Sequence, residues 1–178
     1  RADGGYRMGQ EEKMMRCTNC ENKKLLKSER VNIRYKESGL DNILLIGVER
    51  SQCAACGEEY YRYGNIVQLH DTIAHALLKK DGLLTGKEIK FLRKYLGYSG
   101  ETFSKLSGYR ADSIYKIENG QDRVTSAFDH FIRVIVASKH VDRDYDIHDI
   151  ILSEKFEKFK RLELKSNKAG EWRIQKAA

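Results

Sequence analysis

The four cysteines of this chain form two CxxC pairs, Cys17-Thr-Asn-Cys20 and Cys53-Ala-Ala-Cys56, separated by the 32 residues 21–52. A CxxC turn presents two thiolates from one short loop, and two such turns supply the four sulfur ligands that a structural Zn2+ ion binds in a tetrahedron. Gly57 follows the second pair, where the chain must turn sharply, and Glu21 occupies the matching place after the first. The spacing predicts a structural zinc site with Cys17, Cys20, Cys53 and Cys56 as its ligands.

Other cysteine chemistries fit this pattern less well. Paired disulfides belong to secreted proteins, and nothing in the sequence indicates secretion. A thioredoxin-like redox motif would use one CxxC pair and leave the other unexplained. Catalytic zinc needs an open coordination position, which four cysteines close, and the H-x-E and P-C-x-x-C signature of the zinc deaminases is absent.

The segment between the two pairs has the pattern of a β-hairpin. Val31, Ile33 and Tyr35 alternate with polar residues, as in a half-buried strand, and 43–48 is a second apolar run that leads back to Cys53. Tyr60, Tyr61 and Tyr63 after the second pair are interpreted as a third strand packed on a small core rather than as a partner-binding surface. We expect residues 15–65 to form a module too small to fold unaided, which structural zinc stabilises by about 10 kcal/mol.

The stretch 84–120 has the pattern of three short helices. Thr85 and Glu88 form a capping box, and the apolar residues that follow share one face until Gly97. Ser99 can cap a second, very short helix, and the turn 107–109 leads to a third helix from about 111 that closes at Asn119-Gly120. Two short helices joined by a tight turn, with a helix in front, are typical of a helix-turn-helix, whose second helix enters the DNA major groove.

This stretch resembles the Xre-type helix-turn-helix of bacterial and phage regulators, down to the closing Ile117-Glu118-Asn119-Gly120. Two residues depart from the usual pattern of that family. Gly100 stands where the family often has a glutamine that holds a phosphate, and Arg110 stands at an N-cap position where Ser or Thr is usual. The resemblance implies a DNA-binding domain over residues 84–140.

Two CxxC pairs followed by this helix-turn-helix resemble the MqsA family of antitoxins, with its YgiT-type zinc finger, over roughly residues 15–140. In that family the zinc module binds a toxin, while the C-terminal domain dimerises and binds a palindromic operator. The resemblance implies that the base-reading positions are those of Asp112 and Lys116, where the family typically has Asn and Arg. It also implies a bacterial or phage protein of the cytoplasm.

The residues that would read DNA lie at the exposed start of the third helix. Lys116 and Arg110 can donate to guanine, Asp112 can accept from cytosine or orient a neighbouring cation, and a tyrosine can donate to phosphate or pack on a thymine methyl. The candidate DNA-binding residues are Arg110, Asp112, Ser113, Tyr115 and Lys116.

The rest of the chain is expected to be helical or polar. Residues 1–14 are interpreted as a tag remnant or flexible arm, and 66–83 as a linker helix that connects the modules or packs on the second one. Another helix runs from Thr125 through Lys139. Residues 141–178 are expected to form a C-terminal helical extension that includes Leu162, followed by a polar tail from Lys165 with the chain's single tryptophan, Trp172.

The predicted fold class is therefore α+β, a small four-cysteine module with a short sheet followed by an all-helical domain. A net charge of +7 over 178 residues favours a polyanionic partner, and no run of residues is long and apolar enough for a membrane span. No nucleophile–base pair, phosphate-binding glycine loop or open metal site is apparent, so we expect no enzyme activity. The sequence predicts a transcriptional repressor that binds an inverted repeat in double-stranded DNA as a homodimer. The alternative is an interaction protein that mainly neutralises a protein toxin through its zinc module.

Overall fold

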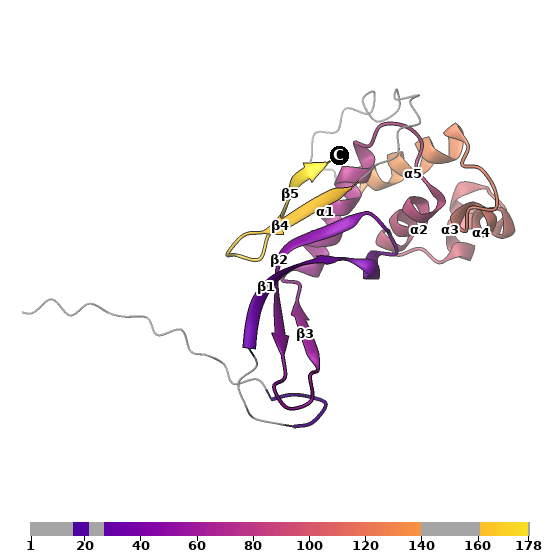
Figure 1. Ribbon diagram of the computed structural model, residues 1–178. Coiled ribbons are helices and arrows are strands. Elements are labelled where there is room, and N and C mark those ends of the chain that lie inside the picture. The colour runs from indigo at the N-terminus through magenta and orange to yellow at the C-terminus, as the bar shows by residue number, and fades with distance from the viewer. Residues whose placement is uncertain (1–15, 22–26, 140–160, 178) are drawn as a thin grey trace, which may run out of the picture. The chain divides into compact units, whose positions relative to one another are not determined.

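A computed structural model describes residues 16–21, 27–139 and 161–177, and these have an α+β architecture (Figure 1). The strands are β1 (Lys27–Arg34), β2 (Ile43–Gln52), β3 (Glu59–Arg62), β4 (Leu162–Ser166) and β5 (Trp172–Ala177), with the 3-10 turn η1 (Lys36–Ser38) after β1. The helices are α1 (Ile66–Leu78), α2 (Gly86–Tyr95), α3 (Gly100–Ser107), α4 (Ala111–Glu118) and α5 (Ser126–Ser138). None of these helices is long and apolar enough to cross a lipid bilayer.

The described residues fall into two compact units. The knuckle unit holds 16–21, 27–31 and Val48–Arg62, and the helical unit holds Asn32–Gly47 together with 63–139 and 161–177. Strands β1 and β2 therefore contribute residues to both units, so the unit boundary runs through the hairpin that the sequence assigns as a whole to a module over 15–65. The predicted arm at 1–14 lies outside the described residues.

Four of the five described helices begin with a side-chain N-cap, and the sequence predicts three of these four caps. Thr85 accepts from the amide of Glu88, and both halves of the predicted capping box are present. Ser99 and Thr125 cap α3 and α5, and Asn65 caps α1, a cap that the sequence analysis does not include. Arg110 precedes α4 without any side-chain cap.

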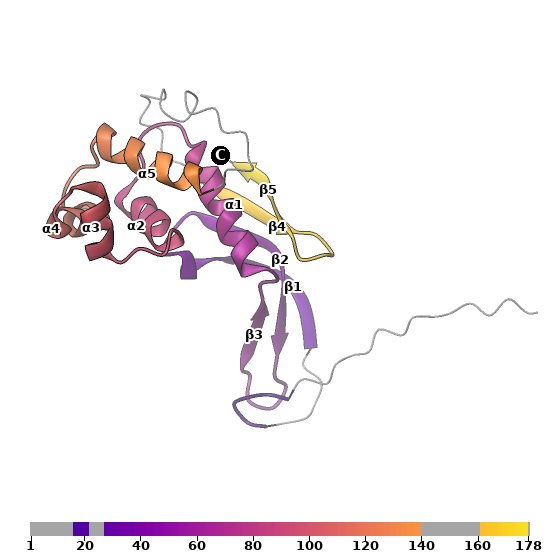
Figure 2. The ribbon, with the colours of Figure 1, turned by 180° about the vertical axis from the view of Figure 1, so that it is seen from behind.

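The three helices expected over 84–120 are present as α2, α3 and α4, within one or two residues of their expected ends. Gly108 ends α3 with a φ of 73°, the left-handed conformation expected for it. The apolar faces of α1, α2 and α5 form the core of the helical unit, with Phe103, Ile114 and Ile117 closing it from α3 and α4. Figure 2 shows α2 to α5 gathered on one side of α1.

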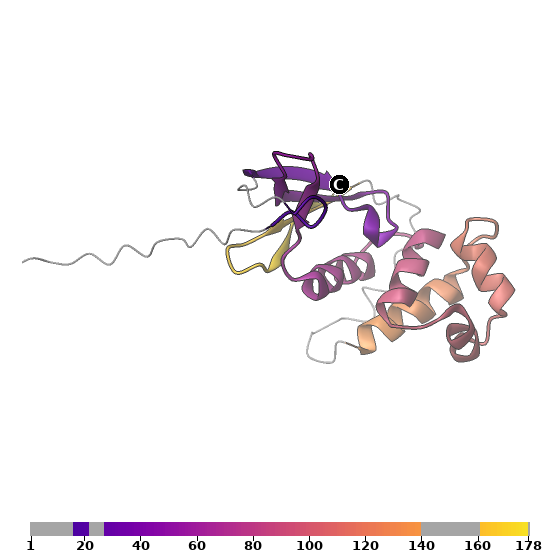
Figure 3. The ribbon, with the colours of Figure 1, turned by 90° about the horizontal axis from the view of Figure 1, so that it is seen from below.

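The segment 161–177 is not a helix followed by a polar tail, as expected from the sequence, but a strand pair. Strand β4 runs parallel to β2, with Ile43 opposite Leu162 and Leu45 opposite Leu164, and β5 is antiparallel to β4. Within the helical unit the strand order is β1-β2-β4-β5, and the helix expected as a linker, α1, packs against β5 (Figures 1 and 3). The part of the predicted extension at 140–160 lies outside the described residues.

Strand β5 is fixed to α1 by polar as well as apolar contacts. Trp172 is buried, and its indole nitrogen donates to the carbonyl of Tyr63 at 2.9 Å. Gln68 of α1 bonds both backbone groups of Trp172, donating to its carbonyl oxygen and accepting from its amide. A tryptophan held in this way belongs to the core, which explains why the segment is not a polar tail.

Candidate metal centre and nucleic-acid interface

The two CxxC turns have matching backbone geometry. The amide of Glu21 donates to the carbonyl of Cys17 at 2.9 Å, and the amide of Gly57 donates to the carbonyl of Cys53 at the same distance. Both residues have positive φ, 55° for Glu21 and 77° for Gly57. Glu21 is the one non-glycine residue with positive φ among the described residues, so the first turn adopts a conformation that its side chain disfavours.

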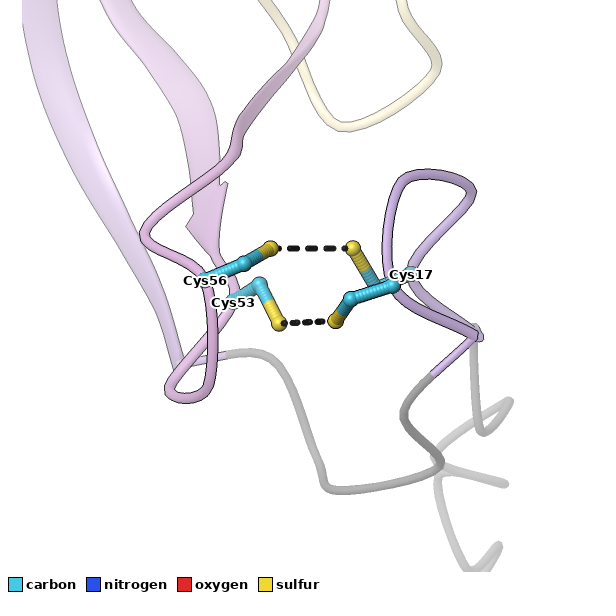
Figure 4. Close-up of side chains that lie close together, drawn as sticks. Cys17, Cys53 and Cys56 are labelled. Carbon is cyan, nitrogen blue, oxygen red and sulfur yellow. Dashed lines mark hydrogen bonds between the residues drawn. The ribbon is translucent and has the colours of Figure 1, made fainter.

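The turns bring all four thiols together. Each Sγ lies within 4.8 Å of the other three, and two of these approaches join different turns, with Cys17 3.5 Å from Cys56 and Cys20 3.7 Å from Cys53. Figure 4 shows the sulfur of Cys17 facing that of Cys56 across the space between the turns. Four sulfurs at about 2.3 Å from a tetrahedral ion would lie about 3.8 Å apart, so this arrangement could hold a metal ion.

None of the four cysteines, all of which are described, takes part in a disulfide. Cys17 and Cys53 are buried, and Cys20 and Cys56 are exposed. The hydroxyl of Tyr60, together with backbone amides of the turn, lowers the pKa of the Cys17 thiol to about 6. Hydrogen bonds from the amides of Cys56 and Ala55 lower the pKa of Cys53. Such hydrogen bonds stabilise thiolates, which are the form of cysteine that binds metals.

The tyrosines expected in a third strand divide between the two units. Tyr60 and Tyr61 lie in β3, which is the predicted third strand and pairs with β2, but Tyr63 belongs to the helical unit. The hydroxyl of Tyr60 lies 3.1 Å from Sγ of Cys17, a contact between residues 43 positions apart that nothing in the local sequence indicates.

The candidate DNA-binding residues run from Arg110, the N-cap of α4, to Lys116 in its last turn. Arg110, Asp112, Tyr115 and Lys116 are exposed, and Ser113 is partly exposed. Tyr115 retains 63% of its accessible surface, a large fraction for an aromatic side chain. The buried residues of the same helix are Ile114, Ile117 and Glu118. Arg110 and α4 together thus expose two cations, one anion and one tyrosine.

A buried ion pair that the sequence analysis misses fixes α4 to α2. Nε and Nη2 of Arg93 donate to the two carboxylate oxygens of Glu118 at 2.6 and 2.8 Å, and Nη1 donates to the carbonyl of Tyr98 at 2.8 Å. The carboxylate of Glu118 raises the pKa of Arg93 further above its usual range. Two parallel bonds of this kind define an orientation as well as a distance, so they fix how α4 is held.

Helices α2 and α4 also approach each other through their backbones. A Cβ atom added to Gly86, the first residue of α2, would lie 2.0 Å from the carbonyl oxygen of Ile117. The position therefore requires glycine for close packing, although its φ is not in the left-handed region.

A groove of about 910 Å³ lies within the helical unit between the loop 36–42 and α2. Its charged side chains include the buried pair Lys80–Glu88, whose Nζ and Oε2 are 2.7 Å apart, and the exposed pair Lys87–Asp41. Its aromatic residues pack on one another, with Phe91 stacked on Tyr95 and edge-on to His70. Because these charged and aromatic side chains already pair with one another, we assign no ligand to this groove.

Comparison of the chain with protein-family models, with curated proteins and with solved structures gives no significant match. The function therefore has to be argued from the metal centre and from the exposed face of α4.

Proposed function

We propose that this protein is a sequence-specific DNA-binding regulator that reads an inverted repeat as a homodimer and carries a structural zinc ion in its knuckle unit. The observation that supports DNA binding most strongly is the pair α3 and α4. Two eight-residue helices are joined by the short turn 108–110, and the second has a buried apolar face opposite an exposed polar one. A helix-turn-helix presents its recognition helix to the major groove in this way.

The side chains on α4 have the chemistry needed for base recognition. Lys116 and Arg110 are exposed cations, and either can donate to O6 and N7 of guanine. Tyr115 and Ser113 add hydroxyl donors for phosphates. Asp112 can accept from cytosine N4, which makes a mixed G·C-containing half-site the expected target. The +7 net charge supplies the non-specific attraction to DNA.

Zinc is the metal we propose because four cysteine ligands close the coordination shell in a tetrahedron, the arrangement of structural zinc sites. Cys17, Cys20, Cys53 and Cys56 would hold the ion, whose chemistry here is to join two distant turns. A closed shell leaves no position for a substrate, which supports a role without catalysis. The two CxxC turns and the order of the helices support the proposal that this protein is an antitoxin-type regulator of the MqsA kind.

The test is selection of binding sites from random duplexes at fixed salt, with wild type, Arg110→Ala, Lys116→Ala and Lys168→Ala. Lys168 is an exposed lysine in the turn between β4 and β5, so its variant is matched in charge loss. We expect wild type and Lys168→Ala to select the same inverted repeat. Each α4 variant should lose about 1–3 kcal/mol of specific binding, roughly 5- to 150-fold in affinity, while its weak non-specific binding remains.

A different result would redirect the proposal. If wild type shows only salt-sensitive binding without a preferred sequence, and the α4 variants do not differ from Lys168→Ala, α4 is not a recognition helix. The knuckle unit would then be the better candidate for the main function, as the part that binds a protein toxin. That alternative is tested by whether purified knuckle-site variants lose binding to the purified product of a neighbouring toxin gene.

A further inference from the structure

The side chain of Tyr60 joins the first CxxC turn to strand β3. Its hydroxyl oxygen lies 3.1 Å from Sγ of Cys17, 3.0 Å from the backbone nitrogen of Thr18 and 3.0 Å from Oγ1 of Thr18. Tyr60 itself is only partly exposed, and Cys17 retains 1% of its accessible surface. A single hydroxyl thus contacts a candidate metal ligand and the residue that follows it.

The directions of these hydrogen bonds follow from counting donors. A metal-bound Cys17 is a thiolate and can only accept, so the one hydroxyl hydrogen of Tyr60 must point at its sulfur. The amide of Thr18 can only donate, and its hydroxyl can donate as well, so both bond to the tyrosine oxygen. Every donor in this arrangement then has an acceptor, and the tyrosine is fixed in one orientation.

We propose that Tyr60 is an outer-sphere positioning residue of the metal centre, which holds the first turn in place and weakens the electron donation of the Cys17 thiolate to the ion. Outer-sphere hydrogen bonds both orient a ligand and adjust its donor strength. The proposal rests on the proposed metal site. It concerns one ligand of four, because the hydroxyl of Tyr60 has a single hydrogen and that hydrogen goes to Cys17.

The position of Tyr60 in the chain explains how one tyrosine can connect the two CxxC turns. It lies four residues beyond Cys56, in the strand that follows the second turn, and so belongs to the hairpin that carries Cys53 and Cys56. The first turn is 42 residues away in sequence. Tyr60 therefore adds a link between the two halves of the site that does not pass through the metal.

The experiment uses the full chain loaded with Co2+, which replaces Zn2+ in four-cysteine sites and gives a sulfur-to-cobalt charge-transfer band. Tyr60→Phe removes the hydroxyl and keeps the ring. Tyr61→Phe is the matched control, since Tyr61 is the next residue of β3 and its hydroxyl donates to Glu59 at 2.7 Å, away from the cysteines. Circular dichroism checks that each variant is folded.

For Tyr60→Phe we expect the charge-transfer band to shift to lower energy, because an unbonded thiolate donates more readily. We also expect metal transfer to a chromogenic chelator to be about tenfold faster, because loss of the hydrogen bond to a charged group frees the first turn from β3, and this outweighs the stronger donation of the thiolate. Tyr61→Phe should match wild type in both. A band that stays unchanged in Tyr60→Phe, or that shifts equally in Tyr61→Phe, overturns the inference.

Two further outcomes separate this inference from the proposed metal site. If wild type takes up no Co2+ or Zn2+, the metal site itself fails. If Tyr60→Phe alone fails to bind Co2+, the role of Tyr60 is tested with Thr18→Ala instead. This variant removes one hydrogen-bond donor to the Tyr60 oxygen and leaves the tyrosine in place. A shift of the charge-transfer band of Thr18→Ala to lower energy, smaller than the shift expected for loss of the whole hydroxyl, supports the role of Tyr60. An unshifted band in Thr18→Ala refutes it.

Discussion

The two units place their charged and apolar side chains in opposite ways. In the knuckle unit, the buried apolar residues among those described are Val48, Cys17 and Cys53. Its ion pairs lie at the surface, where Arg50 contacts Glu29 and Glu59. Exposed pairs of this kind contribute about 0–1 kcal/mol each.

The helical unit instead buries both kinds of side chain. Leucine, isoleucine and phenylalanine residues from all five described helices are fully or almost fully buried. Three ion pairs are buried with them, namely Arg93–Glu118, Lys80–Glu88 and Asp129–Arg133. The knuckle unit thus has four clustered thiols where a larger apolar core would otherwise be expected, while the helical unit has a large core that also contains charged pairs.

The largest effect is expected from removing the proposed zinc ion. Cys53→Ser, or chelation of wild type, should unfold the knuckle unit, because structural zinc contributes on the order of 10 kcal/mol to such modules. The helices of the other unit should remain. Hydrogen exchange read by mass spectrometry checks this, with exchange rising over Val48–Arg62 and unchanged in α1 and α5.

If α1 and α5 lost protection together with Val48–Arg62, the contrast between the two units would be wrong. Restoring the metal to chelated wild type is the control, and it should return the slow exchange of the second turn. Cys53→Ser should not respond to the same addition.

The next largest effect is expected at Arg133, the largest fully buried side chain described. It lies 2.8 Å from Asp129 and donates to backbone carbonyls at and beyond the end of α1, including those of Leu78 at 2.8 Å and Gly82 at 2.8 Å. Arg133→Met should destabilise the protein by about 3–5 kcal/mol, since it leaves Asp129 as an unpaired buried charge. Urea unfolding followed by circular dichroism at 222 nm measures this.

A surface pair provides the control for Arg133. Lys105 and Glu101 are 3.5 Å apart on α3, with side chains 78% and 80% exposed, so Lys105→Ala should change stability by less than about 0.5 kcal/mol. Equal effects of the two variants would show that burial does not distinguish the charges of the helical unit.

The sequence predicts well what depends on neighbouring residues. The caps at Thr85, Ser99 and Thr125 and the two CxxC turns are each set within a few positions, and the structure has all of them. The clustering of the four thiols could be predicted without knowing the fold, because two CxxC turns are the usual ligands of one structural zinc ion. DNA binding, dimerisation and a toxin partner stay predictions, because they concern molecules outside the chain.

The features missed are those that join distant parts of the chain. Leu162 continues the helical spacing of Phe156 and Phe159 but also has strand-like spacing with Leu164. The partners of Leu162 and Leu164 in β2 lie about 120 residues earlier, so the local pattern cannot choose between helix and strand. Arg93–Glu118 and Tyr60–Cys17 are likewise contacts across 25 and 43 residues. Asp129 and Arg133 offered one local signal, a charged pair four residues apart within an apolar stripe.

A smaller effect is expected at the two glycines that begin helices α2 and α3. Gly86→Ala should destabilise the helical unit by about 1–3 kcal/mol, because its Cβ would overlap the carbonyl of Ile117 and push α2 from α4. Gly100→Ala meets nothing within 4 Å and should be neutral or stabilise by up to about 1 kcal/mol. Thermal unfolding of both variants checks this, and a tolerated Gly86→Ala would mean that the two helices are less closely packed.

The smallest effect is expected at the left-handed positions after each CxxC pair, where the two turns can be compared directly. Glu21→Gly should stabilise the metal-bound knuckle unit by up to about 1 kcal/mol, since glycine adopts positive φ without the steric penalty of a side chain. Gly57→Ala should have the opposite sign and a similar size, although no atom lies near enough to obstruct its Cβ. Competition for Zn2+ against a chelator of known affinity measures both. If the affinity for Zn2+ changed in the same direction in both variants, backbone strain would not be what distinguishes the first turn from the second. The carboxylate of Glu21 would then be the remaining difference between the turns, and Glu21→Gln would test it.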